Sequence, residues 1–554
     1  MAATEGDDRI IGTNGNDVID GLGGNDHIDG GLGTDTISGG AGDDVLFIED
    51  RRGVAGESYS GGAGYDRLLI EPANLDLSLV LIGDDIETLD AIDGVRIAAG
   101  QAAKFRAIDT HELIIGGTGI ADLTDVQLVV QIITLADPGL ELMLSEKDFF
   151  DAVVEGSAGT DLVRGSETED VVNGNGGNDI MYGNGGHDQL RGGEGADRLY
   201  GGDGSDWFLV YGSDNVAGDI YDGGEGYDLI LLAGDATLTR IVSIEEIESN
   251  YGVTLGARDF GALEEAEIAS VTINKSGVAD LAGTELETDV INLAVPGVVL
   301  KLEGAIISTW TDQVAINGSL GVDRIIGTIG KDVISTRDGN DVIDGGGGSG
   351  DILGGGAGDD SYRLRADNVI REVVDGGYDV VTTQLDAVTL AANVEKLVFD
   401  GPRTAAFVAT GNATDNLIVA RGGNDQLSGG GGADILHGGQ GLDLLTGGAG
   451  ADRFVFEAAL SVGRNADRVM DFAAEDFILL DRGAFGAAGP QARLAGDAFV
   501  LGAAAKDAED RIVYDQASGR LFYDADGNGA GAQILFARLT AGTELGAADF
   551  QIVG

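Results

Sequence analysis

The chain has 554 residues, including 95 glycines, 5 prolines and no cysteine, and its formal net charge is −62. This acidity excludes nucleic acid as a partner, because phosphates select basic surfaces, and it argues against electrostatic binding to an anionic membrane. The lack of cysteine excludes disulfides, zinc–thiolate sites and thiol nucleophiles.

Aspartates recur every nine residues in the first segment, 1–69, each two residues after a glycine and two before an aliphatic residue. The segments GGLGTDTIS and GGAGDDVLF show the repeated unit, GGxGxDxUx, in which U is apolar. The aspartates at the sixth position of this unit are Asp8, Asp17, Asp26, Asp35 and Asp44.

This spacing predicts calcium sites. Glycine tolerates positive φ and lets the loop turn tightly with its carbonyl oxygens inward, and aspartate adds the anionic oxygen that Ca²⁺ prefers among its roughly 6–8 ligands. The short strand x-U-x buries only its middle residue, since strand side chains alternate between faces. We therefore expect two nonapeptides to form one turn of a right-handed parallel β-roll with Ca²⁺ between stacked loops. A flexible glycine-rich linker would not keep aspartate and aliphatic residues in register.

The same unit recurs in three later blocks, which predict β-roll 2 at 156–231, β-roll 3 at 318–363 and β-roll 4 at 411–456. Their predicted calcium ligands are Asp161, Asp170, Asp179, Asp188, Asp197, Asp206, Asp323, Asp332, Asp341, Asp351, Asp360, Asp425, Asp434, Asp443 and Asp452.

Some copies depart from the pattern. Thr168 and Thr414 replace the loop glycine, which predicts a weak or empty site in the first turn of their blocks. Asn416 takes the aspartate position in the fourth block, and one extra residue precedes Asp351, where the local geometry is therefore in doubt.

Two glycine-poor segments, insert A (70–155) and insert B (232–317), separate the first three blocks. ITLADPGLELML in insert A recurs as INLAVPGVVLKL in insert B, so a unit of roll plus insert is duplicated. Val, Ile and Leu spaced by two predict calcium-free β structure that continues the solenoid with longer turns. Short helices at 121–128 and 243–249 remain an alternative at this stage.

A connecting β segment at 364–410 and a C-terminal domain at 457–554 complete the chain. DADGNG at 524–529 matches the start of an EF-hand loop, but Leu535 stands where that loop requires a bidentate glutamate. A β-hairpin turn is the better interpretation, and we predict no metal there.

The nonapeptides resemble the RTX, or hemolysin-type, calcium-binding repeat, and the ANVEKL phrase at 392–397 is common between RTX rolls. The last hundred residues are similar to the C-terminal domain of serralysin proteases and other type I secretion substrates. That family carries an uncleaved export signal that ends in an acidic residue followed by apolar ones. Asp549, Phe550, Ile552 and Val553 fit this ending, and Gly554 departs from it slightly.

The resemblance implies an all-β fold of right-handed parallel β-roll (RTX solenoid) blocks, calcium-free β inserts and a C-terminal β-sandwich-like domain. It also implies multiple Ca²⁺ ions and export by type I secretion machinery to the outside or surface of a Gram-negative cell. In agreement, MAATEGDDRIIG at the N-terminus lacks the regions of a cleavable signal peptide. No stretch reaches the ~18 apolar residues of a membrane span.

Catalytic motifs are missing from the sequence. His111-Glu112 is not followed by the second histidine of HExxH, and there is no GxSxG elbow. A paired-carboxylate site stays open among the 95 acidic residues. We nevertheless expect the protein not to be an enzyme.

Three functional classes follow. The first is a secreted, calcium-folded surface or matrix protein, such as an adhesin, an S-layer-like coat or a biofilm component, which binds surface polysaccharide or self-assembles. The second is an extracellular polysaccharide-active enzyme with its site in the inserts, although catalytic domains of RTX enzymes usually precede the rolls. The third, a pore-forming toxin, would need a long apolar helical region that is missing from the sequence.

Overall fold

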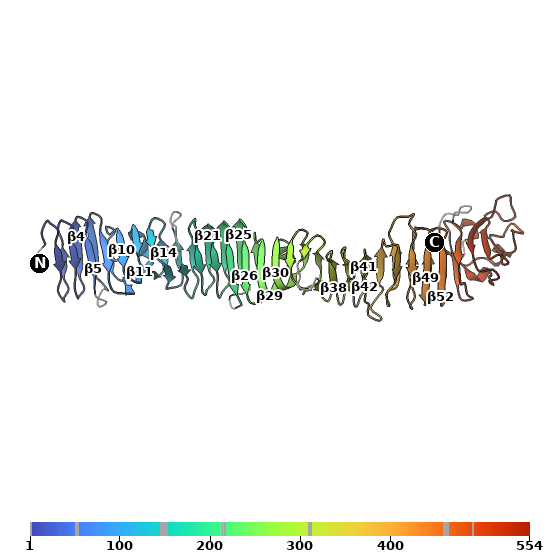
Figure 1. Ribbon diagram of the computed structural model, residues 1–554, viewed down its shortest axis with the longest axis horizontal. Helices are drawn as coiled ribbons and strands as arrows, with labels where there is room; N and C mark the ends of the chain where they lie inside the picture. Colours follow the sequence, from blue (N-terminus) through green and yellow to red (C-terminus); the bar gives the residue numbers. More distant parts are fainter. Residues whose placement is uncertain are drawn as a thin grey trace. The chain divides into compact units, whose positions relative to one another are not determined.

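The computed structural model describes residues 3–49, 55–144, 153–212, 214, 218–307, 313–457, 465–489 and 492–554. The chain divides into two compact units: unit 1 contains Met1–Thr272 and Thr284–Thr288, and unit 2 contains Ile273–Gly283 and Asp289–Gly554. Each unit is a parallel β-solenoid in which successive strands stack side by side (Figure 1).

In unit 1, alternate strands of β-roll 1 join two different parallel sheets. One sheet contains β1 (Arg9–Ile11), β3 (His27–Asp29), β5 (Val45–Ile48), β7 (Arg67–Ile70), β10 (Thr88–Ala91), β12 (Ala107–Asp109) and β15 (Gln127–Val129). The other contains β2 (Val18–Asp20), β4 (Thr36–Ala41), β6 (Ser58–Ala63) and β9 (Leu81–Ile82). Strands two apart in sequence order are neighbours, so two nonapeptides form one turn, as predicted.

Two further sheets of unit 1 run through insert A and β-roll 2. One contains β8 (Leu75–Asp76), β11 (Val95–Ala98), β13 (Glu112–Gly116), β16 (Ile132–Leu135), β18 (Val153–Glu155), β20 (Val171–Asn173), β22 (Gln189–Arg191), β24 (Trp207–Tyr211), β26 (Leu229–Ala233), β27 (Ala236–Thr237) and β29 (Glu246–Gly256). The other contains β14 (Gly119–Asp122), β17 (Leu140–Met143), β19 (Leu162–Arg164), β21 (Ile180–Gly185), β23 (Arg198–Asp203), β25 (Ile220–Glu225) and β28 (Arg240–Val242).

Unit 2 repeats this plan. One sheet contains β31 (Gly277–Asp280), β34 (Val298–Lys301), β37 (Arg324–Ile326), β39 (Val342–Asp344), β41 (Ser361–Leu364), β43 (Val380–Thr383), β45 (Lys396–Phe399), β47 (Leu417–Val419), β50 (Ile435–His437), β53 (Arg453–Phe456), β55 (Phe477–Asp481) and β60 (Phe550–Val553). A second run of paired strands contains β33 (Val290–Leu293), β36 (Gln313–Asn317), β38 (Lys331–Ser335), β40 (Ile352–Gly354) and β42 (Val369–Ile370).

A third sheet of unit 2 contains β44 (Ala387–Thr389), β46 (Val408–Thr410), β49 (Gln426–Gly431), β52 (Leu444–Ala449), β54 (Asp467–Val469), β59 (Ile534–Arg538), β58 (Arg520–Tyr523), β57 (Ile512–Asp515) and β56 (Phe499–Leu501). The remaining strands are β30 (Glu265–Lys275), β32 (Glu285–Glu287), β35 (Ile306–Ile307), β48 (Gly422–Gly423) and β51 (Gln440–Gly441). The helical segments are η1 (Ala99–Lys104), α1 (Ala257–Phe260), η2 (Gly486–Ala488), η3 (Gly496–Ala498) and η4 (Ala547–Asp549). In the described part of the chain, no helix is long and apolar enough to cross a membrane.

The U residues form the core of each solenoid. Ile10 pairs in register with Ile28, Ile28 with Leu46, and Leu46 with Leu68, and all four are buried. The next residue in this row is Leu89 of insert A. Each fully buried aliphatic side chain contributes roughly 1.5–3 kcal/mol, so every added turn extends the same apolar column.

The inserts continue the solenoid, as the spacing of Val, Ile and Leu predicted. The helices considered at 121–128 and 243–249 do not form, because these residues lie in or beside β14, β15, β28 and β29. Ala121 and Leu123 are buried, and their spacing of two residues places both on one face of an extended segment.

The C-terminal domain extends the sheets of β-roll 4. β55 and β60 continue one sheet, while β54 and β59 continue the other in parallel pairs. β57–β58 and β58–β59 are antiparallel. DADGNG therefore lies in the connection of the β58–β59 hairpin, as expected, and the absence of a metal from this segment stays a prediction.

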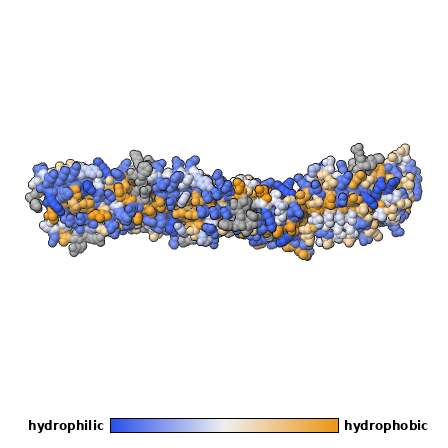
Figure 2. All heavy atoms as spheres, in the orientation of Figure 1, coloured by the Kyte–Doolittle hydropathy of each residue, from blue (hydrophilic) through white to orange (hydrophobic). Residues whose placement is uncertain are grey.

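Outward-facing positions are mixed in character. Exposed apolar side chains include Val18, Leu320 and Val374, and apolar residues are scattered among hydrophilic ones on the face shown in Figure 2.

Candidate calcium sites

The predicted ligand aspartates lie at the ends of the loops, directly before or at the start of the short strands. Asp8 and Asp17 are partly exposed, and the other predicted ligands are buried. Burying a carboxylate without a partner costs much free energy. The contacts of each carboxylate oxygen therefore show what the position can bind.

One oxygen of each carboxylate links successive turns. The backbone N–H of Asp8 donates to Oδ1 of Asp26 at 2.7 Å, and the N–H of Asp26 donates to Oδ1 of Asp44 at 2.7 Å. Repetition of this bond stacks the carboxylates into ladders along the solenoid. In this way a local sequence period becomes two rows of acidic groups along the roll, one before the strands of each sheet.

The ladders include every predicted ligand. They run through Asp8, Asp26, Asp44, Asp66 and Glu87; Asp17 and Asp35; Asp161, Asp179, Asp197 and Asp219; Asp170, Asp188, Asp206, Asp228 and Glu245; Asp323, Asp341, Asp360, Asp379 and Glu395; Asp332, Asp351 and Asn368; Asn416, Asp434, Asp452 and Asp476; and Asp425, Asp443 and Asp467.

Several of these ladder residues were missed by the nine-residue count: Asp66, Asp219, Asp228, Asp379, Asp467 and Asp476. Asp66 and Asp228 end complete GGxGxD motifs, GGAGYD and GGEGYD, but each lies 22 residues after its ladder neighbour because the intervening turn is longer. A search for the GGxGxD motif that did not require a nine-residue step would have found Asp66 and Asp228. Three ladders end in a glutamate that the repeat motif does not predict: Glu87, Glu245 and Glu395.

The extra residue before Asp351 does not break its ladder. The Asp332 N–H donates to Oδ1 of Asp351 at 3.0 Å, and the Asp351 N–H donates to Oδ1 of Asn368 at 3.1 Å. The additional residue is accommodated within the loop.

The second oxygen of most ladder aspartates is buried without a hydrogen-bond partner. Oδ2 of Asp26, Asp44, Asp179, Asp188 and Asp434 are examples. A Cβ at Gly39 would collide with Oδ2 of Asp44, so the first glycine of the motif is required by the close approach of this oxygen. Orphaned anionic oxygens in glycine loops are the donor set that suits a hard cation such as Ca²⁺, so the residues present fit this ion.

Burial raises the pKa of these carboxyls, and neighbouring carboxylates raise it further. The pKa of Asp179 rises to about 7 and that of Asp188 to about 8, and those of Asp360 and Asp434 rise to about 7. Accepting a backbone N–H bond opposes this rise in each case. A bound cation would remove the repulsion that the stacked anions otherwise suffer.

The first turns differ from the others in the hydrogen bonds that a loop Ser or Thr donates to the aspartate. Oδ2 of Asp161 accepts from the N–H and the hydroxyl of Ser157, at 2.7 Å each. Similar bonds join Asp8 to Thr4, Asp17 to Thr13, Asp170 to Ser166, Asp323 to Ser319 and Asp332 to Thr328. A loop Ser or Thr thus occupies Oδ2, which is unpaired in later turns, while Oδ1 of Asp161, Asp170 and Asp323 is buried without a partner. The prediction of weak or empty first-turn sites at Thr168 and Thr414 stays a prediction.

Comparison with known proteins agrees with the ladders. A family model described as the RTX calcium-binding nonapeptide repeat (4 copies) matches residues 3–37, 23–47, 155–190, 182–217, 192–230, 317–352, 410–445 and 429–458. These matches overlap all four predicted rolls. No curated protein matches the sequence.

Proposed function

We propose, from the premise that this chain contains RTX repeats that bind multiple Ca²⁺ ions, that the protein leaves a Gram-negative cell unfolded and folds outside it. Its role there is that of a cell-surface or matrix component, such as an adhesin, a coat or part of a biofilm. Type I secretion machinery reads its C-terminal segment.

The stacked carboxylates with unpaired buried oxygens are the observation that carries this proposal. Metal-free ladders place like charges next to one another in a site with little water, which opposes folding. Calcium binding supplies folding free energy directly when a site forms only in the folded state. A chain of this kind stays unfolded where the free calcium concentration is low and folds where it is high.

The structural role is supported by how the described residues are used. In the described residues the rolls and inserts form the solenoid, and the C-terminal domain extends its sheets. RTX solenoids typically serve structural or binding roles. Imaging and attachment assays of the producing strain, with and without the gene, test the surface role. An unchanged surface and unchanged attachment would contradict it.

Deletion of residues 495–554 tests the export step. We expect this truncation to stay in the cytosol, because the proposed signal lies within it. The double variant D179A/D188A is the control: it weakens the calcium ladders but keeps the C-terminus, so it should still be exported. Full secretion of the truncation, or retention of the control, would overturn the export mechanism.

A further inference from the structure

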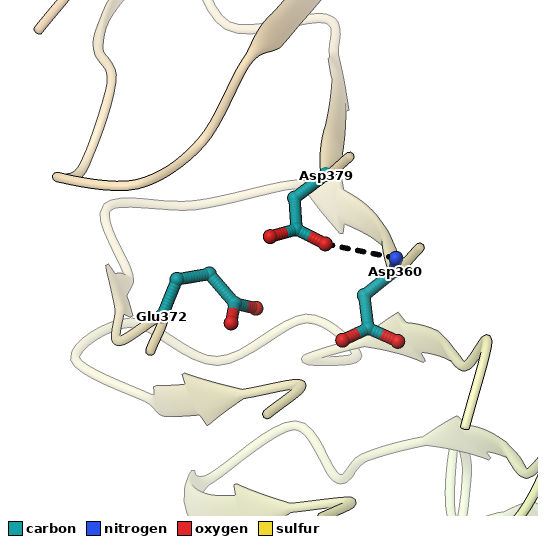
Figure 3. Close-up of side chains that lie close together, drawn as sticks. All are labelled: Asp360, Glu372 and Asp379. Atoms are coloured by element: carbon teal, nitrogen blue, oxygen red, sulfur yellow. Dashed lines mark hydrogen bonds between the residues drawn. The ribbon is translucent and has the colours of Figure 1, made fainter. Parts of the chain in front are cut away.

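In unit 2, three carboxylates meet where β-roll 3 passes into the connecting segment. Asp360 ends the loop GGAGDD, Asp379 ends the loop VDGGYD, and Glu372 follows β42 by two residues. One ligand oxygen from each lies within 4.8 Å of the others, and in the described part of the chain no other group of three His, Cys, Asp or Glu side chains meets this closely. Figure 3 shows the three carboxylates turned toward a common space.

Two of these side chains are fully buried and incompletely bonded. Oδ1 of Asp379 accepts the backbone N–H of Asp360 at 2.9 Å, and Oδ1 of Asp360 accepts the N–H of Asp341 at 2.7 Å. Both aspartates are 0% exposed, and Oδ2 of each has no hydrogen-bond partner. Two orphaned anionic oxygens are therefore directed toward the region that Glu372 enters.

Glu372 is held in place by neutral donors. Its Oε1 accepts from the Tyr362 hydroxyl and from the Gly355 N–H at 3.3 Å, and its Oε2 accepts from the Gly356 N–H at 3.3 Å. No Lys or Arg in the described residues forms an ion pair with any of the three acids. The cluster thus contains three acidic groups and no compensating cation from the protein.

The loop itself explains why a glutamate enters. In the loop of Asp228, the first motif position is Gly223, and a Cβ there would collide with Oδ2 of Asp228. In the loop of Asp379 this position is Val374, which is 76% exposed. The nonapeptide loop is thus incomplete at Asp379, and Glu372 brings a carboxylate to the gap from outside the repeat.

We infer that Asp360, Glu372 and Asp379 form a calcium site with three carboxylate ligands, and that Glu372 is its distinguishing ligand. The inference rests on the proposal that the ladder aspartates bind calcium. An additional charged ligand raises calcium affinity, so this site fills at lower free calcium than the two-carboxylate gaps and fixes the end of β-roll 3 to the connecting segment.

Hydrogen exchange of the full-length protein, followed as a function of free Ca²⁺, tests this site. In the wild type, peptides covering 355–383 should become protected at lower calcium than those covering 323–345. Glu372→Gln keeps the acceptor oxygen but removes the charge, and it should raise the calcium midpoint of the 355–383 peptides at least about tenfold. At saturating calcium the protection should return to the wild-type level.

Glu303→Gln is the matched control. It makes the same charge change on an exposed glutamate of unit 2, which pairs with Arg365 at 2.9 Å, and it should leave that midpoint unchanged. Asp188→Ala tests the premise separately. If Asp188→Ala shifts its own peptides and Glu372→Gln shifts none, the three-carboxylate site is wrong; if neither variant shifts a midpoint, the ladder assignment is wrong as well.

A direct measurement covers the case in which Glu372→Gln does not fold at any calcium concentration. Anomalous diffraction from wild-type crystals grown in Ca²⁺ should show an ion about 2.3–2.6 Å from a Glu372 carboxylate oxygen. An ion bound to Asp360 and Asp379 without Glu372, or no ion in this gap, would overturn the inference.

Discussion

Asp161 and Asp179 occupy the same repeat position in successive turns of β-roll 2, but their carboxylates have different partners. Oδ2 of Asp161 accepts two hydrogen bonds from Ser157, whereas Oδ2 of Asp179 is buried and unpaired. The pKa of Asp179 is raised to about 7 by burial. β-roll 4 carries an amide at the corresponding first position, where Asn416 accepts the N–H of Asn412 at 2.7 Å. Each of the two aspartates keeps one buried oxygen without a partner, Oδ1 in Asp161 and Oδ2 in Asp179, so at the residue scale the loop Ser adds donors to Asp161 without satisfying both of its oxygens.

Replacing each aspartate with asparagine should separate these two kinds of position. Asp161→Asn keeps an acceptor for Ser157 and should raise the calcium midpoint of folding less than Asp179→Asn does, because two donors of Ser157 already stabilise the Asp161 side chain. Calcium titrations followed by circular dichroism measure both midpoints. Equal shifts of the calcium midpoint in the two variants would show that the hydrogen bonds from Ser157 do not replace the metal.

Metal ligands and core residues should also differ in their dependence on calcium. The double variant D179A/D188A should raise the calcium midpoint, because both side chains belong to ladders. Leu190→Ala should instead lower the stability of the roll at saturating calcium, by roughly 2–5 kcal/mol for a buried leucine. Chemical denaturation at saturating calcium and calcium titration distinguish the two effects.

Asp235→Ala is the control for this pair. Asp235 lies outside the ladders, and its Oδ1 accepts the Gly252 N–H at 2.9 Å, so its loss should cost a little stability without moving the calcium midpoint. A midpoint shift as large as that of D179A/D188A would contradict the assignment of ligands by ladder.

At the scale of an element, a roll behaves as a column of coupled acids. The pKa is raised for most of the buried ladder aspartates, because burial disfavours the charged form and stacked carboxylates repel; at the partly exposed Asp17, hydrogen bonds from Thr13 lower it instead. Asp332 and Asp360 reach about 7, and Asp188 and Asp467 reach about 8. Protons and calcium ions therefore compete for the same oxygens.

Acid should partly substitute for calcium in folding a roll. A carboxyl whose pKa is higher in the folded chain than its ordinary 3.8 stabilises the fold fully below that value, and this contribution is lost as pH rises through the folded pKa. In chelator, β structure should thus be greater near pH 5 than at pH 8, with most of the loss between about 6 and 8. Circular dichroism across this range is the measurement, and a pH-independent spectrum would contradict the prediction.

At the scale of the whole molecule, the net charge of −62 makes folding depend on cations. Self-repulsion of this size destabilises a compact chain. About twenty bound Ca²⁺ ions would return about +40 and leave an acidic, soluble protein. Size selectivity adds to the charge effect, since Mg²⁺ requires a tighter octahedral site and retains its waters.

The full chain should accordingly be largely disordered in chelator at neutral pH and rich in β structure at millimolar Ca²⁺. Mg²⁺ should replace Ca²⁺ poorly, and NaCl at matched ionic strength should not replace it, because general screening provides no ligand geometry. Identical β spectra in chelator and in calcium would refute calcium-dependent folding.

The sequence by itself determined the β-rolls, their U-residue core and most of the ladder aspartates. These features depend on a nine-residue period. Within it the glycines allow the tight turn, the aspartate places a carboxylate at the end of the loop, and the aliphatic residue is the buried position of the strand. The strands of the inserts were predicted for a similar reason, since buried residues spaced by two produce a strand whether or not a metal is present.

Tertiary structure decided the contacts that join one turn to the next. Asp66 and Asp228 complete ladders across 22 residues, and Glu372 reaches Asp360 and Asp379 from outside any repeat. Stacking depends on where a loop lies in space and not on how many residues precede it, so lengthening a turn breaks the sequence period but preserves the ladder. The same holds for 121–128 and 243–249, where the apolar column of neighbouring turns selected strand over helix.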